Sequence, residues 1–329
     1  MEKKKVLYYN IDDSLDYENS LLKEWGIDNL ELVEVKDKEN KKSFIEYAQG
    51  FQGVVVEYQQ MTREIIEQLP DLEIITLQSI GYNNVDVEAA TKNGVCVTNI
   101  PGFCTEEVAL HAVGMLIDLV RKITFLDRSV RKGMWDPLYG YKTYRLSGKT
   151  IGLYFFGSIP KAMMPVLKAL GLKVLVYAPT KTKEYLAEFG AEKAETFEEL
   201  LINSDFVSLH CPLMESTTHL ISEKELKLMK EDAYLINTAR GAVVDEKALV
   251  KALKEGWIKG AAVDVIEDED TEKSELFELE NTVITPHAAF VSEDSFYSGR
   301  EKALKQLVLR LAQNKVPENL VNKDLKIDF

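Results

Sequence analysis

The sequence predicts an α/β protein built from two doubly wound parallel sheets. Short apolar segments alternate with amphipathic helical segments along the chain, which is the pattern of βα units around a parallel sheet. The alternation runs through two successive series, each over 100 residues long, and the second begins after Gly148. We therefore expect two α/β domains, which the length of 329 residues permits.

The first series supplies the elements of one sheet. Its expected strands are Val6–Tyr9, Leu30–Val35, Gly53–Val56, Glu73–Leu77 and Val95–Thr98. Helical patterns lie between them at Ser43–Gln49, Thr62–Gln68 and Val85–Lys92. A long helix is expected from about Thr105 to Phe125, after Pro101-Gly102.

The second series supplies the other sheet. Its expected strands are Thr150–Phe155, Lys173–Tyr177, Phe206–Leu209, Ala233–Asn237, Gly260–Val263 and Thr282–Ile284. The helices between them include Lys161–Leu170, Glu223–Leu228 and Glu246–Gly256. A final helix is expected from about Glu293 to Gln313, before an irregular tail.

The composition argues against several classes of protein. With 46% hydrophobic and 29% charged residues the chain resembles ordinary globular proteins, and no apolar run of about 18 residues is present to span a membrane. The N-terminus lacks the apolar core of a secretory signal. A formal charge of −14 argues against nucleic-acid binding. Cys96, Cys104 and Cys211 form no CxxC pair, so we expect no disulfide framework, no metal site and a cytoplasmic location.

The second series opens with a strand, a tight turn and a helix. At such a place backbone amides and a helix N-terminus bind the pyrophosphate of a dinucleotide. The usual fingerprint is G-x-G-x-x-G, and this chain has Phe155, Gly157 and Pro160 at the three glycine positions. Gly157 keeps the bare backbone that lets phosphates approach. Taken alone, the motif gives equal weight to a bound dinucleotide and to a turn without a ligand.

The strand Lys173–Tyr177 ends without the acidic residue that binds the adenosine ribose in NAD-selective sites. Ala178 stands at this position, and Thr180, Lys181 and Lys183 follow it. Positive charge suits the 2′-phosphate of NADP. The segment therefore favours NADP or dual use, with a solvated helix start as an equally weighted alternative.

Three later strands are each followed by a residue suited to binding or proton transfer. Arg240, Asp264 and His287 come just after successive expected strands, and Glu269 lies five residues beyond Asp264. Ligands of open α/β sheets bind at the carboxyl ends of the strands, an arginine fork suits a carboxylate, and histidine titrates near neutral pH. The set could converge on one crevice, although each residue alone is equally well explained as a surface group.

These residues lie in segments that resemble the D-isomer-specific 2-hydroxyacid dehydrogenases. The stretch Gly148–Phe290 resembles the cofactor domain of that family. The resemblance is carried by Asn237–Gly241, Val244–Glu246, Ala262–Val265, Thr285–His287, Ser208–Leu213 and Thr217–His219, and outside that domain by Gly81–Asp86 and Pro101–Val108. The chain departs from the family pattern at Phe155, Pro160 and Ala178.

The resemblance implies an oxidoreductase that transfers a hydride between NAD(P) and a small 2-hydroxy or 2-keto acid. It implies a flavodoxin-like substrate domain of residues 1–100 and 291–329, and a Rossmann-type dinucleotide-binding domain of residues 101–290. His287 would be the acid/base, Glu269 would pair with it and favour the imidazolium, and Arg240 would bind the substrate carboxylate. The resemblance also implies a homodimer formed through the Thr105–Tyr141 arm.

Further contacts are implied in the same way. The substrate carboxylate would meet the backbone amides of Ser79, Ile80 and Gly81, with Tyr58 and Gln59 as candidate pocket walls. The cofactor-binding residues would be Gly157, Ser158, Ile159, Ala178, His210, Pro212, Thr217, Ala239 and Asp264. His111 and His219 receive no role and are expected to be structural.

Two other functions stay open on the sequence alone. A non-enzymatic, dinucleotide-sensing protein on the same fold is favoured by the altered glycine turn, because fold does not fix function. The complete set of Arg240, Glu269 and His287 favours the enzyme instead. A phosphoglycerate-type biosynthetic enzyme is the third interpretation, and it would be expected to carry extra basic residues near the substrate loop.

Overall fold

The computed structural model describes residues 3–11, 14–140, 142–271 and 273–327. The chain divides into two compact units, which we call unit 1 (Met1–Cys104 with Ser292–Phe329) and unit 2 (Thr105–Val291). Unit 1 is therefore discontinuous in sequence. Tyr141, the expected end of the dimerisation arm, lies outside the described residues.

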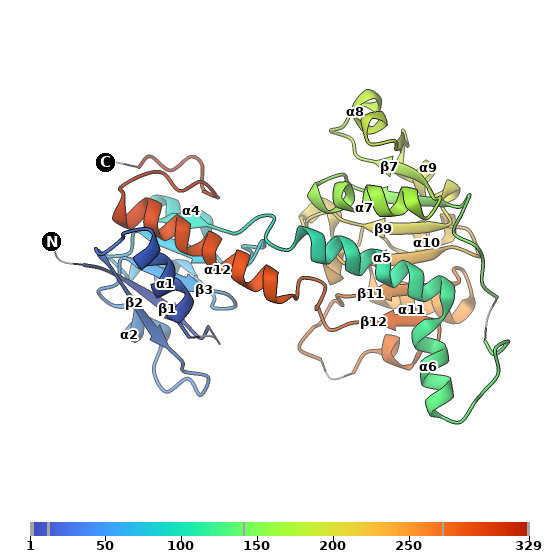
Figure 1. Ribbon diagram of the computed structural model, residues 1–329, viewed down its shortest axis with the longest axis horizontal. Helices are drawn as coiled ribbons and strands as arrows, with labels where there is room; N and C mark the ends of the chain where they lie inside the picture. The colour runs from blue at the N-terminus through green and yellow to red at the C-terminus, as the bar shows by residue number, and fades with distance from the viewer. Residues whose placement is uncertain (1–2, 12–13, 141, 272, 328–329) are drawn as a thin grey trace. The chain divides into compact units, whose positions relative to one another are not determined.

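The described part of unit 1 contains a five-stranded parallel sheet with the order β2-β1-β3-β4-β5. Figure 1 labels β1, β2 and β3 of this sheet. The strands are β1 (Lys4–Tyr9), β2 (Leu30–Val35), β3 (Gly53–Val56), β4 (Ile74–Leu77) and β5 (Cys96–Thr98). The helices are α1 (Asp16–Glu24), α2 (Phe44–Ala48), α3 (Arg63–Glu67), α4 (Val87–Lys92) and α12 (Glu293–Leu307), followed by the π-helical turn η4 (Val308–Ala312).

Both faces of this sheet are covered, which explains why β3 and β4 are apolar without alternation. Strand residues such as Val6 and Val55 pack with α1 and α12 in one core, and their neighbours Leu7 and Val54 pack with α2 and α4 in another. The return of the chain as α12 thus completes unit 1. The buried Glu18 of α1 pairs with an arginine of α12 at 2.6 Å.

The described part of unit 2 contains a seven-stranded parallel sheet with the order β12-β11-β10-β9-β6-β7-β8. The strands are β6 (Thr150–Tyr154), β7 (Lys173–Tyr177), β8 (Glu192–Lys193), β9 (Phe206–Leu209), β10 (Tyr234–Asn237), β11 (Gly260–Val263) and β12 (Thr282–Ile284). The chain builds outward from β6 in one direction and then, from β9, in the other. The carboxyl ends of β6 and β9 therefore flank the switch point at which open α/β sheets bind ligands.

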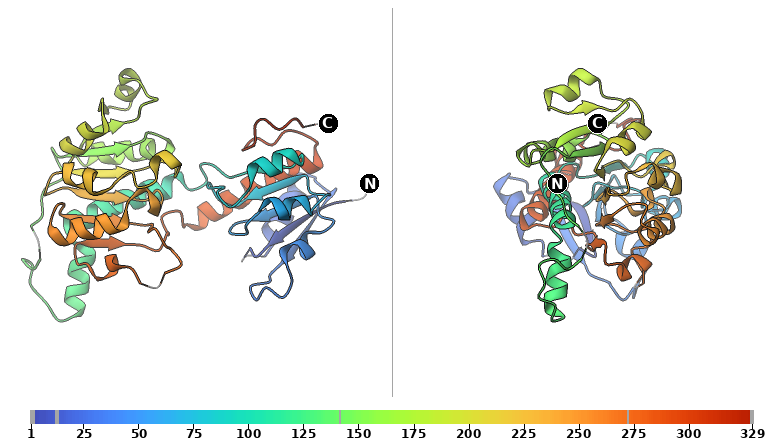
Figure 2. Two further views of the ribbon diagram at one scale, coloured as in Figure 1. Left: turned by 180° about the vertical axis from the view of Figure 1, so that it is seen from behind. Right: turned by 90° about the vertical axis from the view of Figure 1, so that its right-hand side faces the viewer.

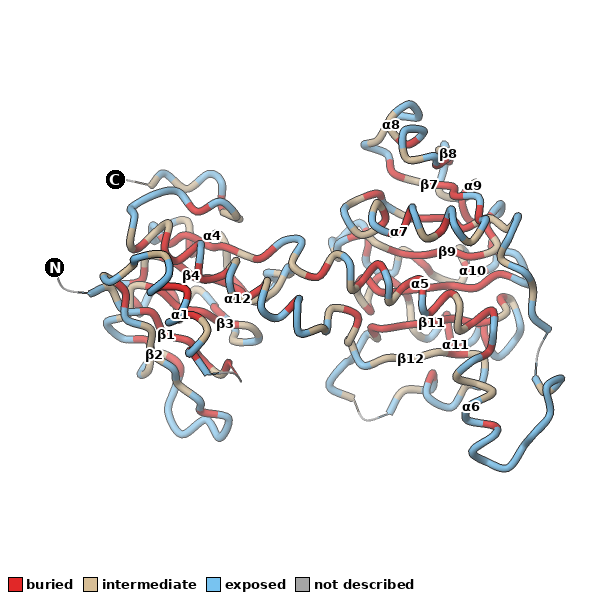
Figure 3. Tube along the Cα trace, in the orientation of Figure 1, coloured by how far each residue is buried: buried red, intermediate tan, exposed pale blue. Residues whose placement is uncertain are grey.

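Helices cover the two faces of this sheet, as the front and back views in Figures 1 and 2 show. On one face α5 (Thr105–Arg121) and α7 (Ser158–Ala169) pack on residues such as Ile151 and Val174. On the other face α9 (Phe197–Asn203), α10 (Glu223–Leu228) and α11 (Glu246–Glu255) pack on residues such as Val207 and Leu235. Figure 3 shows the resulting burial of the strands. The shorter elements are α6 (Ile123–Arg131), α8 (Lys183–Glu188), η1 (Glu215–Thr217), η2 (Gly241–Val243) and η3 (Glu275–Glu278).

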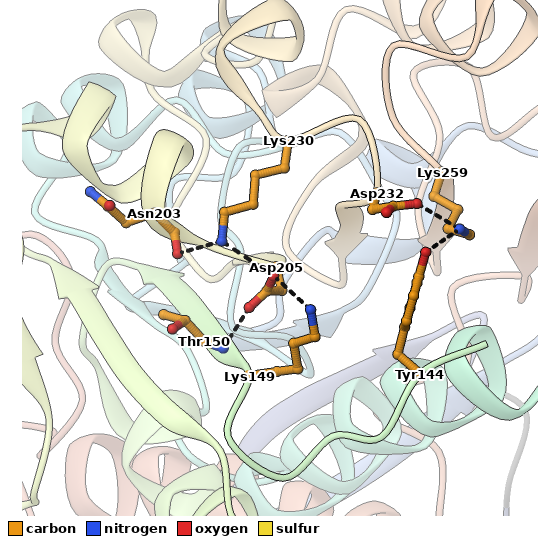
Figure 4. Close-up of polar contacts among 8 residues, drawn as sticks. All are labelled: Tyr144, Lys149, Thr150, Asn203, Asp205, Lys230, Asp232 and Lys259. Carbon is orange, nitrogen blue, oxygen red and sulfur yellow. Dashed lines mark hydrogen bonds and ion pairs between the residues drawn. The ribbon is translucent and has the colours of Figure 1, made fainter. Parts of the chain in front are cut away.

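The amino ends of the unit 2 strands are joined by a polar network (Figure 4). The Asp205 carboxylate accepts from the Thr150 backbone at 2.9 Å and from Lys149 and Lys230 at 3.3 and 3.2 Å. Burial raises the pKa of Asp205, but these hydrogen bonds outweigh it, and its pKa is lowered overall. The network stabilises the amino-end edge of the sheet, opposite the carboxyl ends at which ligands of such sheets bind.

Several boundaries differ from the expected ones. The long helix expected from about Thr105 to Phe125 ends at Arg121, because Lys122 adopts a left-handed φ of 57° and the Asp118 carboxylate accepts from the Thr124 backbone at the start of α6. The helix expected from Lys161 already begins at Ser158. The short elements α1, α8, β8 and α9 were not expected. No helix among the described residues has the length and apolarity that crossing a membrane requires.

Candidate active site

The turn after β6 fits a dinucleotide pyrophosphate. Gly157 caps the 12-residue helix α7, Ser158 at its first position is exposed, and Ile159 is partly buried. The amides of this helix end lie at the switch point of the sheet. Phe155 has a left-handed φ of 77°, and a Cβ on Gly157 would lie 3.3 Å from its ring. The glycine-like turn is therefore kept with a phenylalanine, whose ring flanks the approach to Gly157.

The end of β7 carries no acid but gathers positive charge. Ala178, directly after the strand, is 2% exposed. Beyond it the ammonium groups of Lys161 and Lys181 lie 5.4 and 5.3 Å from the centroid of the Tyr185 ring. Lys161 comes from α7, and nothing in its local sequence pattern separates it from a solvated helix residue. Two cations therefore share one aromatic ring beside the end of β7.

The loop after β9 is fixed from inside. His210 hydrogen-bonds through Nε2 to the Ser208 hydroxyl at 2.9 Å, and burial lowers the pKa of His210 to about 3. The ring is therefore neutral at physiological pH. The hydroxyl of the buried Thr217 donates to the Pro212 carbonyl at 2.7 Å and also accepts from the Met214 backbone. Pro212 and Thr217 thus shape this loop.

The turn after β10 presents Arg240. The buried Asn237 side chain accepts from the Ala239 backbone at 3.0 Å and donates to the Arg240 carbonyl at 2.9 Å. The Arg240 guanidinium donates to the Ala239 carbonyl at 2.7 Å. One buried amide therefore fixes the backbone on both sides of the arginine. Gly241 follows, and a Cβ there would lie 1.8 Å from the Ile266 carbonyl oxygen.

Asp264, after β11, organises the turn that carries His287. Its carboxylate accepts from the Thr285 hydroxyl at 2.5 Å and from the backbones of Ala288 and Ala289 at 2.8 and 3.0 Å. Its carbonyl accepts from the His287 backbone at 2.7 Å. His287 has a left-handed φ of 52°, so this turn needs the support. A contact of Asp264 with the cofactor stays a prediction.

His287 and Glu269 meet on the loops after β12 and β11. The Nδ1 of His287 lies 2.8 Å from a Glu269 carboxylate oxygen, and both side chains are partly exposed, at 41% and 43%. Because a carboxylate only accepts, Nδ1 carries the hydrogen. Nε2 is thus the nitrogen that can give or take a proton, which is the arrangement of a histidine held by an acid.

Two further histidines contact residues near His287 and Glu269 in sequence. His111 of α5 lies 2.9 Å from the Thr285 hydroxyl, which accepts from it because its own hydrogen goes to Asp264. His219 pairs through Nε2 with the Glu267 carboxylate. No periodic pattern or motif spacing identifies these partners, since each pair is far apart in sequence.

The expected substrate loop lies in unit 1, after β4. The Ser79 hydroxyl donates to the Gly81 carbonyl at 2.7 Å, and Asn99 donates to the Ile80 carbonyl, also at 2.7 Å. The loop is thus held by its carbonyl groups. Tyr58 is 80% exposed.

The structure brings the expected unit 2 residues to one edge of one sheet. Arg240, Asp264 and His287 follow β10, β11 and β12, which are consecutive neighbours in the sheet. In the described part of the chain, no group of three or more His, Cys, Asp and Glu residues could hold a metal ion.

Comparisons with known proteins show the family to which the chain belongs. Residues 113–289 match the family model of the D-isomer specific 2-hydroxyacid dehydrogenase NAD binding domain. Glyoxylate reductase of Thermococcus litoralis is 45% identical over 270 residues, covering 80% of this chain and 81% of that protein. D-lactate dehydrogenase of Aquifex aeolicus, solved with NAD and lactic acid, superposes with a TM-score of 0.81 at 28% identity and covers 96% of this chain and 99% of its own.

A second solved structure carries the other nicotinamide cofactor. An acyclic imino acid reductase in complex with NADPH and D-Arg superposes with a TM-score of 0.83 at 27% identity, covering 96% of this chain and 99% of its own. The matching family model and relatives establish an enzyme, so the non-enzymatic alternative is not retained. The chain belongs to the D-isomer specific 2-hydroxyacid dehydrogenase family and is an NAD(P)-dependent oxidoreductase of small 2-hydroxy or 2-keto acids.

Proposed function

We propose that this protein reduces a small 2-keto acid of the glyoxylate class, with His287 as the acid, Glu269 as its partner and Arg240 as the carboxylate ligand. The observation that carries the proposal is the 2.8 Å contact between His287 Nδ1 and Glu269. The names of the 45% and 41% identical relatives, both glyoxylate reductases, support the substrate class.

The proton chemistry rests on His287. With Nδ1 committed to Glu269, the Nε2–H of the imidazolium donates a proton to the keto oxygen during reduction, and neutral Nε2 removes the hydroxyl proton during oxidation. The Glu269 carboxylate accepts from the Nδ1–H and fixes the orientation of the ring. The bound nicotinamide would supply the hydride.

Arg240 would hold the substrate from its carboxylate. Its guanidinium follows β10, next to the strands that precede Glu269 and His287, and Asn237 fixes its backbone. A planar fork can bind a carboxylate through two parallel hydrogen bonds and can polarise the keto oxygen beside it. The amides of Ser79, Ile80 and Gly81 in unit 1 are the second proposed carboxylate contact.

We propose that the dinucleotide lies on Gly157, Ser158 and Ile159, and that NADP is used at least as well as NAD. Ala178 has no carboxylate to accept from the ribose hydroxyls or to repel a 2′-phosphate. Lys161 and Lys181, together on the Tyr185 ring, would add positive charge near that phosphate. The acyclic imino acid reductase in complex with NADPH supports this part of the proposal.

His210, Pro212, Thr217, Ala239 and Asp264 complete the proposed cofactor contacts. His210 is neutral, and so it adds no charge beside the dinucleotide. The buried Asp264 places most of its hydrogen-bonding capacity in the turn of His287. Its proposed contribution to the cofactor site is therefore to fix that turn.

A homodimer formed by the arm is also part of the proposal. Trp135 and Leu138, just beyond α6, are each 86% exposed, and Ile123 and Val130 on α6 are 57% and 45% exposed. A second copy would cover these apolar side chains. Light scattering should give twice the chain mass, and Trp135→Asp should shift the protein toward monomer. The three buried, free cysteines suit the proposed cytoplasmic location.

The test of the function uses the purified protein with NADH or NADPH and a panel of glyoxylate, pyruvate, hydroxypyruvate and phenylpyruvate. Loss of nicotinamide fluorescence should be fastest with the smallest acids. No loss with any member of the panel, under conditions in which the dinucleotide binds, would refute the proposed substrate class.

A further inference from the structure

The acidic loop after β11 is held by two histidines. Glu269 contacts the Nδ1 of His287 at 2.8 Å, and Glu267, two residues earlier, contacts the Nε2 of His219. The two carboxylates are close in sequence, whereas the histidines come from the loops after β12 and η1. A run of four acids, Glu267-Asp268-Glu269-Asp270, thus has two of its members committed to specific partners.

His219 is itself fixed to the turn that carries Arg240. Its backbone N–H donates to the Ala242 carbonyl at 2.8 Å, and Ile221 two residues later donates to the Val243 carbonyl at 3.1 Å. His219 has a left-handed φ of 50°, an uncommon conformation for a histidine. The residue therefore links the backbone after Arg240 to the side chain of Glu267.

The other side of the acidic loop is packed closely. Gly241 leaves no space for a side chain against the backbone of Ile266 and Glu267. The Glu267 backbone N–H donates to a Glu246 carboxylate oxygen at 3.1 Å, and the other Glu246 oxygen accepts from the Ser274 hydroxyl at 2.6 Å. The loop is therefore fixed at its start by α11 and by the Arg240 turn. Among the described residues of this loop, Glu267 is the one whose side chain contacts His219.

We infer that His219 and Glu267 are positioning residues, which hold Glu269 against His287 and tie that pair to the turn of Arg240. The inference rests on the proposed roles of Glu269 and His287. Neither His219 nor Glu267 touches the reacting atoms in this arrangement. Glu267 and Glu269 are separated by one residue on the same short loop. Fixing Glu267 therefore also restricts the position of Glu269, and through it the reaction.

The experiment compares His219→Ala with His219→Gln in the full-length protein. The glutamine amide can place a donor near the position of Nε2, whereas alanine removes it. The alanine variant should lose about tenfold or more in kcat for 2-keto acid reduction, since ångström-scale misplacement of a catalytic group costs up to about 10²-fold. The loss should fall on kcat rather than on KM, because His287 transfers the proton and does not bind the substrate carboxylate. The glutamine variant should keep kcat within about threefold.

A double-mutant cycle separates positioning from general destabilisation. In a Glu269→Gln background, His219→Ala should have little further effect on kcat, because the path through Glu269 is already lost. Glu267→Met, which removes the acceptor of His219 with little change of volume, offers the same test should His219→Ala fail to fold. Glu223→Gln is the matched control, because it removes a partly exposed carboxylate of α10 that pairs with Lys251 of α11 at 2.8 Å, and it should leave kcat and KM unchanged.

A measurement without turnover keeps this inference separate from the proposed function. The chain has only four histidines, so nitrogen-detected NMR of the free protein can follow the His287 ring. Variants that each replace one histidine assign the signals. His219→Ala should change the Nδ1 and Hδ1 chemical shifts of His287, which report its hydrogen bond to Glu269, whether or not any 2-keto acid is reduced. Unchanged Nδ1 and Hδ1 shifts of His287, or kcat effects that add fully with those of Glu269→Gln, would overturn the inference.

Discussion

Gly241 is the position at which one methyl group should disturb most of the active site. A Cβ there would lie 1.8 Å from the Ile266 carbonyl oxygen, 2.1 Å from the Ile266 carbonyl carbon and 2.7 Å from the Glu267 nitrogen. All three neighbours are backbone atoms, which cannot rotate away. Restoring a separation of 3.0 Å from the oxygen requires a shift of at least 1.2 Å, the difference from 1.8 Å. Either the Arg240 turn or the loop leading to Glu269 must move.

We therefore predict that Gly241→Ala lowers kcat about 10²-fold, the cost expected for an ångström-scale misplacement in an active site. Overpacking of this kind should also destabilise the fold by about 1–3 kcal/mol. The assay is kcat at saturating dinucleotide and 2-keto acid, with thermal unfolding measured on the same samples. Dinucleotide affinity should fall as well, because the proposed cofactor contacts Ala239 and Asp264 lie two residues from Gly241 and Ile266.

Gly114→Ala is the matched control, because it adds the same methyl group to an exposed position of α5 with no atom within 4 Å of the new Cβ. It should stabilise unit 2 by about 0.5–1 kcal/mol, as expected for alanine over glycine in a helix, and leave kcat unchanged. If Gly241→Ala kept kcat within threefold of wild type, the close packing of the two turns would not be needed for catalysis.

Three other predictions test separate parts of the account. Arg240→Lys should lower kcat/KM by about 10- to 100-fold, because losing a charge-assisted hydrogen bond costs roughly 1.5–3 kcal/mol; unchanged kcat and KM would exclude the bidentate clamp. Ala178→Asp should shift the ratio of NADPH to NADH dissociation constants at least about tenfold toward NADH, since about 1.4 kcal/mol suffices; a wild type that already binds NADH tenfold tighter would contradict our interpretation of this position. Burial lowers the pKa of His210 from 6.5 to about 3. As the pH falls below 6.5, the unfolded chain therefore binds a proton at this residue, whereas the folded chain does not. Wild type should therefore lose about 2 kcal/mol more stability than His210→Gln between pH 7 and pH 5, and equal losses in urea unfolding would show that this ring is not the cause.

The α/β architecture could be predicted because fully buried parallel strands are short apolar runs, such as Val54–Val56 and Leu235–Ile236. The apolar pattern does not predict the other elements, because they bury few residues or depend on single backbone and side-chain contacts. Helix α1, Asp16–Glu24, is mostly polar and buries only Glu18, Leu21 and Leu22. The break between α5 and α6 depends on the left-handed Lys122 and on the Asp118 carboxylate, neither of which changes the apolar periodicity.

The residues of the candidate site also differ in how far the sequence predicts them. Arg240, Asp264 and His287 could be selected because each follows a strand, and the order of parallel strands brings their ends to one edge. Glu269 could be selected only by its offset from Asp264, and its contact with His287 required the structure. Pairs such as His219 with Glu267 or Lys161 with Tyr185 join loops and helices far apart in sequence. Periodicity and motif spacing carry no information about such contacts.

The central claim is that His287 transfers the proton, and a single variant tests it most directly. His287→Asn can keep an amide near the position of Nδ1, where Glu269 accepts, while removing the nitrogen that transfers the proton. Reduction of the best 2-keto acid should be measured in single turnovers, together with the dinucleotide dissociation constant. The account predicts that turnover falls about 10²- to 10⁴-fold with dinucleotide binding nearly unchanged. A variant that keeps more than about a third of wild-type turnover would contradict it, because loss of a general acid should cost at least 10²-fold.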